Sequence, residues 1–248
     1  MRDPVRDDGV HAPPGNDSPN GEAVFQARPD RQLVTDWVYE ELRGAIIDLR
    51  LQPGAPLREA AIATQLGVSK TPLREALGRL EQEGLVETTS FKGAVVTDYS
   101  ERDLQEIYEL RQLLEGAAVR TAATDASAET REELREVIEQ SRALRDAGDL
   151  TRLADLLGRF DLLLYEQVTN RRIRGLIDTL RAHLTRIGKL TEDIPGRVVA
   201  SVEEHAAIVE AIARTDPDEA ERAIRIHIAS VLADQLAGVR ANHGEPPR

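Results

Sequence analysis

Four ionisable residues stand on helical stripes of apolar residues, where side chains normally face a core: Arg111, Asp161, His205 and His227. Burying a charge costs free energy unless the group is paired or coordinated, so such residues on four helices indicate an internal site. Two imidazoles and a carboxylate can hold a divalent metal ion of the zinc, nickel or manganese type. Asp161, His205 and His227 are therefore candidate metal ligands. Arg111 offers a bidentate contact for a carboxylate, and we expect Arg111, His205 and His227 to bind a small organic-acid effector.

A second set of polar and cationic residues lies at the start of a helix expected to run from Ser69 to about residue 82. Ser69 is a favoured N-cap residue, and Pro72 fits the first turn, where its missing N–H costs nothing. Leucines recur at helical spacing on the inner face of this helix. Lys70, Thr71 and Arg74 then share the outer face near its N-terminus. In a helix-turn-helix, this end of the second helix enters the major groove of DNA.

Each of these side chains has an expected role on DNA. Arg74 is assigned to a base edge, because a guanidinium pairs bidentately with guanine. Lys70 and Thr71 are assigned to base or phosphate contacts, and Ser69 to a phosphate. Lys92, which falls in a loop between two expected strands, would reach the DNA backbone or the minor groove.

The elements that would position this helix are short and closely spaced. Helices are expected at 31–48 and 58–65, the second ending before Gly67, where a positive φ is often needed. Small Ala63, then Gly67 and apolar Leu73, follow the spacing of a helix-turn-helix whose two helices cross closely. Two short strands expected at 85–87 and 94–96 would form a wing. In the first helix, the apolar residues at roughly helical spacing are Leu33, Trp37, Leu42, Ala45 and Ile46.

From Ser100 onward the apolar periodicity is helical throughout, with breaks at Gly148, Asn170, Pro195-Gly196 and Asp216-Pro217. Short connections between long helices indicate antiparallel packing. We expect a mainly α fold, in which an N-terminal winged helix-turn-helix precedes an antiparallel six- to seven-helix bundle. The expected bundle helices are 100–124, 128–147, 149–168, 171–190, 197–214 and 217–238.

The expected domains follow from these elements and from composition. They are a disordered tail over 1–30, a DNA-binding domain over 31–98, a helical ligand-binding and dimerisation domain over 99–240, and a frayed tail over 241–248. The net charge of −12 is unfavourable for DNA binding. However, residues 31–98 carry 8 basic and 10 acidic residues, a net charge of only −2. A near-neutral module binds DNA when its cations cluster on one face.

Composition also excludes several classes of protein. The chain has no cysteine, which removes disulfides, thiolate metal sites and cysteine nucleophiles. It has no apolar run near the ~18 residues that a membrane span needs, and its N-terminus lacks the apolar region of a signal peptide. We therefore expect a cytoplasmic protein with no membrane partner.

Residues 38–96 resemble the GntR-type winged helix. The resemblance is carried by Pro53-Gly54, the unbroken run from Leu66 to Leu77, the run Glu83-Gly84-Leu85-Val86 and Gly93. It implies a transcriptional regulator, usually a repressor, that binds double-stranded operator DNA as a homodimer. Two positions depart from the family pattern. The family usually has Arg where Lys70 stands, and it has a basic residue in the run that here reads Glu59-Ala60-Ala61-Ile62. Arg58 is the nearest candidate replacement for that DNA contact.

Residues 100–238 resemble the C-terminal ligand domain of the FadR-like branch of that family. The run Leu110 to Glu115, Glu204-His205 and His227-Ile228 carry the resemblance, with Phe160 and Asn170 in the middle. It implies an all-helical domain with an internal effector site. In metal-binding members, the middle helix supplies an Asp and, four residues later, a His. Those positions are Leu157 and Asp161 here, so the implied site is reduced to His205, His227 and Asp161.

Two other functions remain open on the sequence. One is a constitutive DNA-binding protein whose helical domain only dimerises, in which case the polar residues of the bundle would pair with one another. The other is a metal-dependent enzyme built on Asp161, His205 and His227. The enzyme reading has no further support, because the chain has neither a phosphate-binding loop nor a Gly-x-Ser-x-Gly motif. We therefore expect a regulator and not an enzyme.

Overall fold

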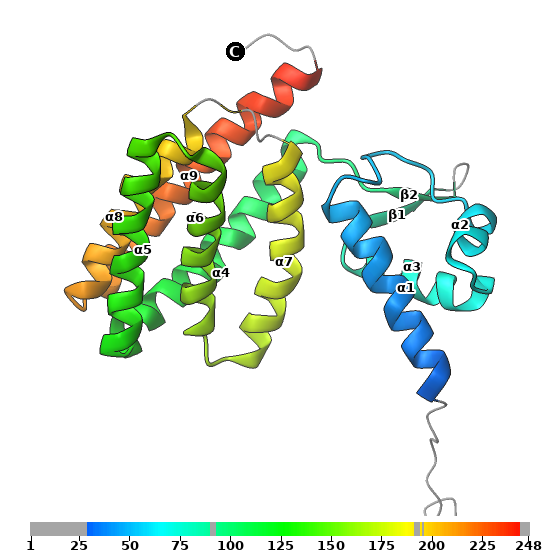
Figure 1. Ribbon diagram of the computed structural model, residues 1–248, viewed down its shortest axis with the longest axis horizontal. Coiled ribbons are helices and arrows are strands. Elements are labelled where there is room, and N and C mark those ends of the chain that lie inside the picture. The colour runs from blue at the N-terminus through cyan, green and yellow to red at the C-terminus, as the bar shows by residue number, and fades with distance from the viewer. Residues whose placement is uncertain (1–28, 90–92, 191–193, 195, 244–248) are drawn as a thin grey trace, which may run out of the picture.

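The computed structural model describes residues 29–243 except 90–92, 191–193 and 195. Two groups of elements lie side by side, a small winged helix and a larger helical bundle (Figure 1). Lys92 and nearly all of the expected N-terminal tail lie outside the described residues. No helix of the described part of the chain is long and apolar enough to cross a membrane.

The winged helix, residues 29–96, contains three helices and a two-stranded antiparallel sheet. Gly67 ends its second helix in the left-handed region, with φ 64°. This is the positive φ expected at the turn, and glycine adopts it without a Cβ penalty. The strands pair from Val86 opposite Val96 to Thr89 opposite Gly93. The elements are α1 (Pro29–Ile47), α2 (Glu59–Leu66), α3 (Lys70–Gln82), β1 (Val86–Thr89) and β2 (Gly93–Val96).

Only part of the apolar stripe expected on α1 is buried. Leu33 and Trp37 are 67% and 47% exposed, whereas Val38 and Leu42 are buried. The reason is that α1 carries apolar residues on two faces, and the face of Val38, Leu42 and Ile46 packs against α3. The N-terminal end of α1 extends beyond the remainder of the winged helix (Figure 1), so it has few neighbours to cover Leu33.

The bundle consists of the helices that follow Ser100. Ser100 caps the first of them in a capping box with Asp103, and Ser127 and Asp149 cap the next two through their side chains. Such caps satisfy backbone N–H groups that a helix start leaves unpaired. The bundle helices are α4 (Glu101–Asp125), α5 (Ala128–Ala147), α6 (Leu150–Glu166), α7 (Arg171–Leu190), α8 (Arg197–Ala213) and α9 (Pro217–His243).

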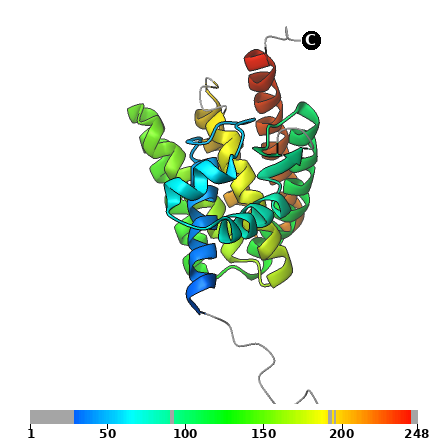
Figure 2. The ribbon, with the colours of Figure 1, turned by 90° about the vertical axis from the view of Figure 1, so that its right-hand side faces the viewer.

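The core of the bundle is mainly aliphatic, as the low aromatic content predicts, with a few aromatic side chains. Leu134, Phe160, Leu164 and Ile208 are among its fully buried members. The long helices α4 and α9 pack along one another, with Arg120 bonded to Asp218 and Arg240 to Glu101 at opposite ends. Figure 2, turned by 90°, shows the winged helix in front of this bundle.

Candidate DNA-binding surface and effector cavity

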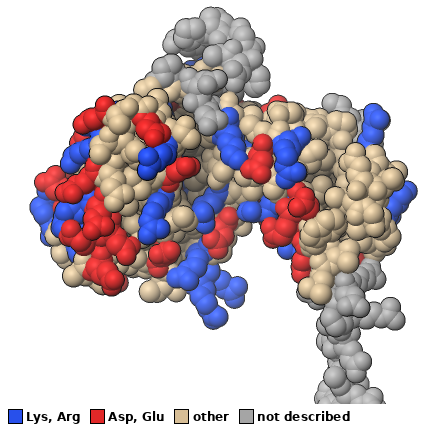
Figure 3. All heavy atoms as spheres, viewed as in Figure 1, with Lys and Arg blue, Asp and Glu red and all other residues tan. Residues whose placement is uncertain are grey.

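The start of α3 presents its polar residues to solvent. Ser69, Lys70, Thr71 and Arg74 are exposed, whereas the leucines of the same helix are buried. Ser69 occupies the N-cap position, but its side chain makes no capping hydrogen bond. On the face shown in Figure 3, basic side chains lie at the outer edge of the winged helix, and acidic ones gather at the far end of the bundle. On this face, acidic side chains therefore lie mainly away from the outer edge of the winged helix.

Arg74 has an acidic partner in the DNA-free chain. Its Nε donates to Glu59 Oε2 at 2.8 Å, and the two side chains are 65% and 34% exposed. Glu59 is the first residue of α2 and lies in the run where the resemblance places a basic residue. An ion pair this exposed contributes little free energy, so a phosphate or a guanine can compete for Arg74. Arg58, exposed at the N-cap of α2, stands beside this pair in the sequence.

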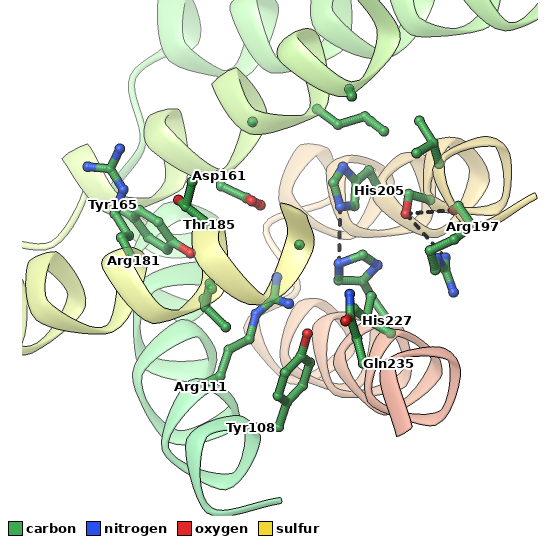
Figure 4. Close-up of a pocket in the computed structure, with 18 residues that line it drawn as sticks. Tyr108, Arg111, Asp161, Tyr165, Arg181, Thr185, Arg197, His205, His227 and Gln235 are labelled. Carbon is green, nitrogen blue, oxygen red and sulfur yellow. Dashed lines mark hydrogen bonds between the residues drawn. The ribbon is translucent and has the colours of Figure 1, made fainter. Parts of the chain in front are cut away.

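A cavity of about 360 Å³ lies inside the bundle, with walls from α4, α6, α7, α8 and α9. This volume is within the range of small-molecule sites. Arg111, Asp161, His205 and His227 all line it, together with residues that the sequence analysis did not single out (Figure 4). The additional polar lining residues are Tyr108, Tyr165, Arg181, Thr185, Arg197, Ser201 and Gln235.

Arg111 is held at the cavity wall by a buried carboxylate. Its Nε donates to Glu115 Oε1 at 2.8 Å, and the hydroxyl of Tyr165 donates to the same oxygen. Burial lowers the pKa of Arg111, but Glu115, together with the smaller effects of Tyr165, Asp161 and Tyr108, more than offsets this, so the pKa is raised and the guanidinium stays charged. Figure 4 shows the end of this guanidinium directed into the cavity.

The two expected histidines meet across α8 and α9. The Nε2 atoms of His205 and His227 are 3.3 Å apart, and the ring of Phe160 stacks on His205 at 4.1 Å between centroids. Burial lowers the pKa of both imidazoles, most strongly that of His205. His227 Nδ1 donates to Glu204 Oε2 at 2.7 Å. If both rings are neutral, His205 Nε2 donates to His227 Nε2, which is the only proton arrangement that serves both contacts.

Behind the histidines, Arg197 joins α8 to α9. It is almost fully buried, pairs with Glu204, and donates to Ser230 Oγ at 2.7 Å and Asp234 Oδ2 at 3.0 Å. The sequence analysis missed Arg197 and Glu204. Their spacing with Ser201, at i, i+4 and i+7 on one helix face, is the signal that indicates a shared inward face. The contact of Glu204 with His227 has no such signal, because it joins different helices.

Asp161 lies on the α6 wall of the same cavity and is half-buried. Burial, reinforced by the nearby negative charge of Glu115, raises the pKa of Asp161 to about 7. At neutral pH this group is thus divided between a carboxylate and a protonated hydrogen-bond donor. Leu157, one turn earlier on α6, gives the wall an apolar surface at the position where the resemblance implied an aspartate.

The expected metal ligands do not gather into a three-donor set. Among the residues that the structure describes, no group of three or more His, Asp or Glu side chains lies close enough together to hold a metal ion. His205 and His227 face each other, but Asp161 does not complete the set, and Leu157 has no donor atom. The donor set therefore does not fit a resident divalent ion, and the cavity is better described by its guanidinium and imidazole groups.

A solvent-exposed helix-turn-helix beside a helical domain with a polar internal cavity defines a ligand-binding transcriptional regulator. Two family models match the chain: "Bacterial regulatory proteins, gntR family" over residues 35–96, and the FCD domain over residues 106–230. The chain belongs to the GntR family of bacterial regulatory proteins, and its bundle is an FCD domain. Its known relatives are regulators, and it is not an enzyme.

Named relatives agree with this assignment. The chain is 33% identical, over 206 residues, to a probable D-xylose utilization operon transcriptional repressor of Paenarthrobacter nicotinovorans, covering 83% of this chain and 90% of the relative. It is 26% identical over 200 residues to the transcriptional repressor RspR of Escherichia coli, covering 81% and 88%. The solved structure of E. coli McbR/YncC has the same fold, with a TM-score of 0.66, 24% identity, and coverage of 83% and 98%.

Proposed function

We propose that this regulator is a repressor whose affinity for operator DNA changes when a small organic acid binds in the cavity of the bundle. The observation that carries the proposal is the buried guanidinium of Arg111, directed into a cavity large enough for a small molecule. Arg111 pairs with Glu115 through its Nε, and an anionic occupant would accept from the end of the guanidinium that is directed into the cavity.

The distribution of charge around the cavity supports an anion more generally. Three guanidinium groups line it, those of Arg111, Arg181 and Arg197. The carboxylates that pair with two of them, Glu115 and Glu204, are not part of the cavity lining. Asp161 is the acidic side chain of this lining, and its pKa of about 7 reduces its negative charge at neutral pH, so the three guanidinium groups give the lining a net positive charge. A carboxylate with few carbon atoms matches both the charge and the volume.

The test is a thermal-denaturation screen of the full chain with a panel of mono-, di- and tricarboxylates and their uncharged amides. A carboxylate that binds raises Tm, whereas its amide does not. The double variant Arg111→Gln/Glu115→Gln removes the guanidinium without leaving a buried carboxylate unpaired, and it should lose the shift. Arg102→Gln, an exposed arginine of the same helix, is the matched control. Equal shifts by amides and carboxylates would contradict the proposed class of effector.

On DNA, we propose that two winged helices of a homodimer read the two halves of an operator. A palindromic site requires matching two-fold symmetry in the protein. Arg74 is the proposed base-reading residue, supported by Lys70, Thr71, Ser69, Arg58 and Lys92 at bases or phosphates. Sedimentation equilibrium of the free chain should give a dimer, and selection from random duplexes should return sites with inverted repeats. A monomer that selects a single half-site would contradict this.

We also propose that the effector binds without a metal ion, since the donor set around His205 and His227 is incomplete. Elemental analysis of the full chain, purified without chelators and then mixed with zinc, nickel or manganese, should find well under one ion per chain. One tightly bound ion that is lost in His227→Ala would contradict this and would restore the metal site expected from Asp161, His205 and His227. A bundle that binds no acid and no metal would favour the constitutive DNA-binding alternative.

A further inference from the structure

One helix of the bundle, α7, faces both the cavity and the winged helix. Arg181, Leu184, Thr185 and Gly188 line the cavity, and their spacing of i, i+3, i+4 and i+7 places them on one face. Figure 1 shows α7 on the side of the bundle nearest the winged helix. The residues of α7 that contact the winged helix or its connection to the bundle lie on the other face: Ala182, His183, Arg186 and Lys189.

One contact runs from His183 to the end of α3. His183 Nε2 lies 2.7 Å from the backbone carbonyl of Glu83, the C-cap of α3, and its Nδ1 lies 2.9 Å from the Tyr99 hydroxyl. A carbonyl only accepts, so Nε2 donates and, in the neutral ring, Nδ1 accepts from Tyr99. One imidazole thus ties α7 both to the helix expected to read DNA and to the segment that enters the bundle.

A second contact, made by Arg186, is incompletely satisfied. Arg186 is fully buried and its Nη2 donates to the Thr97 carbonyl, yet its Nε and Nη1 have no hydrogen-bond partner within the described part of the chain. The hydroxyl oxygen of Thr97 is also buried without a partner there. Buried polar groups normally find partners. The guanidinium carbon of Arg186 also lies 4.8 Å from the centroid of the Tyr99 ring, so Arg186 contacts two residues of the connection between winged helix and bundle.

Two further contacts extend the junction along α7. Ala182 is buried in the apolar core of the winged helix, and Lys189 Nζ pairs with Asp48 at 2.6 Å, just beyond α1. Together these contacts, from Ala182 to Lys189, span about two turns of α7. A shift or rotation of α7 would therefore move the end of α3 and the end of α1 as well.

We propose that α7 is the element that couples the cavity to the winged helix. An occupant that contacts Thr185 and Gly188 displaces α7, the His183 contact passes this displacement to the end of α3, and the Arg186 contact passes it to Thr97 after β2. The inference deepens the proposed function by naming how cavity occupancy reaches the DNA-reading helix. It rests on a rigid helix whose two faces have different partners, which is how a small shift at one site becomes a domain rearrangement.

The test measures the distance between winged helix and bundle in the full chain, without effector or DNA. The chain has no cysteine, so Thr88→Cys on β1 and Gln140→Cys on α5, both exposed, can carry spin labels. Labelled chain is mixed with excess unlabelled chain, so that distances within one chain dominate. Gly188→Leu then places a side chain into the cavity from α7. Gly175→Leu makes the same change on the same helix outside the cavity lining, and neither Cβ position has a neighbour within 4 Å.

We expect Gly188→Leu to shift or broaden the distance distribution, and Gly175→Leu to leave it unchanged. His183→Leu should broaden the distribution by itself, and Gly188→Leu should have no further effect in that background. His183→Gln keeps an N–H donor for Glu83, so it should restore much of the effect of Gly188→Leu. A distribution unaffected by Gly188→Leu, or a Gly188→Leu effect that persists in full with His183→Leu, would overturn the proposal. This experiment uses no acid, so its result does not depend on the carboxylate screen, and the two proposals can fail independently.

Discussion

Arg74 carries the expected base contact, and without DNA it pairs with Glu59. We expect Arg74→Ala to weaken binding to a selected operator duplex by about 1–3 kcal/mol, because one bidentate contact is lost. Affinity for random duplexes should fall much less. Fluorescence anisotropy with both duplexes measures this, with Arg102→Ala as the control. An equal loss on both duplexes would assign Arg74 to phosphate rather than to a base.

Substitution of Glu59 should have the opposite effect on operator affinity. Glu59→Gln removes a negative charge that faces the phosphates and releases Arg74 from its pair, so operator affinity should rise several-fold at low salt. The gain should shrink as salt is added, since it is electrostatic. Anisotropy titrations at several salt concentrations test this. A fall in affinity would mean that Glu59 holds Arg74 in its DNA-reading position.

The charged residues around the cavity show how far single positions can be predicted. Arg111, His205 and His227 were identified because they interrupt apolar stripes, and all three are buried at the cavity wall. Glu115 was not identified as the partner of Arg111, although it stands four residues away on the same helix. Glu204 could not be paired with His227 from spacing, because that contact depends on how α8 packs against α9.

The helices themselves could be predicted almost completely, because caps and breaks mark their ends. Residues 128–147 and 171–190 match α5 and α7. The clearest difference is at α9, expected to stop at 238 but continuing to His243. Arg240, beyond the expected end, forms a double hydrogen bond with Glu101 at the start of α4. That tertiary contact holds the last turns of the helix, and no local signal announces it.

The junction on α7 gives a prediction about pH. Burial lowers the pKa of His183, a hydrogen bond from Nε2 to Glu83 opposes this, and the charges of Arg186 and Arg43 add to the lowering. In the unfolded chain His183 has its ordinary pKa near 6.5, so the unfolded state binds a proton first as the pH falls. The free energy of unfolding should therefore decrease as the pH falls below about 6.5.

His205 and His227 act in the same direction, so a variant is needed to isolate His183. Urea unfolding of wild type and His183→Gln between about pH 5 and 8 makes the comparison. The wild type should lose stability more steeply than the variant on the acid side. Parallel curves would show that His183 keeps its ordinary pKa in the folded chain and that its contacts are weaker than the distances indicate.

Across the whole molecule, the expected DNA-reading surface and the cavity are far apart in sequence, and α7 contacts both the cavity and the winged helix. Family membership accounts for the two units, but it does not say what enters the cavity or how the signal passes. Those answers depend on packing between α7 and the winged helix, which periodicity alone does not encode. Allosteric coupling in such a system is a difference in operator affinity between the empty and the occupied cavity.

The most direct test of the account titrates the full chain onto a fluorescent operator duplex selected by the wild-type protein. The titration is done with and without the carboxylate that most raises Tm. We expect the operator Kd to change by about five-fold or more for wild type, the lower end of typical coupling. The Kd of Arg111→Gln/Glu115→Gln should not respond to the acid. An operator Kd that stays the same at saturating acid in the wild type would contradict the central claim.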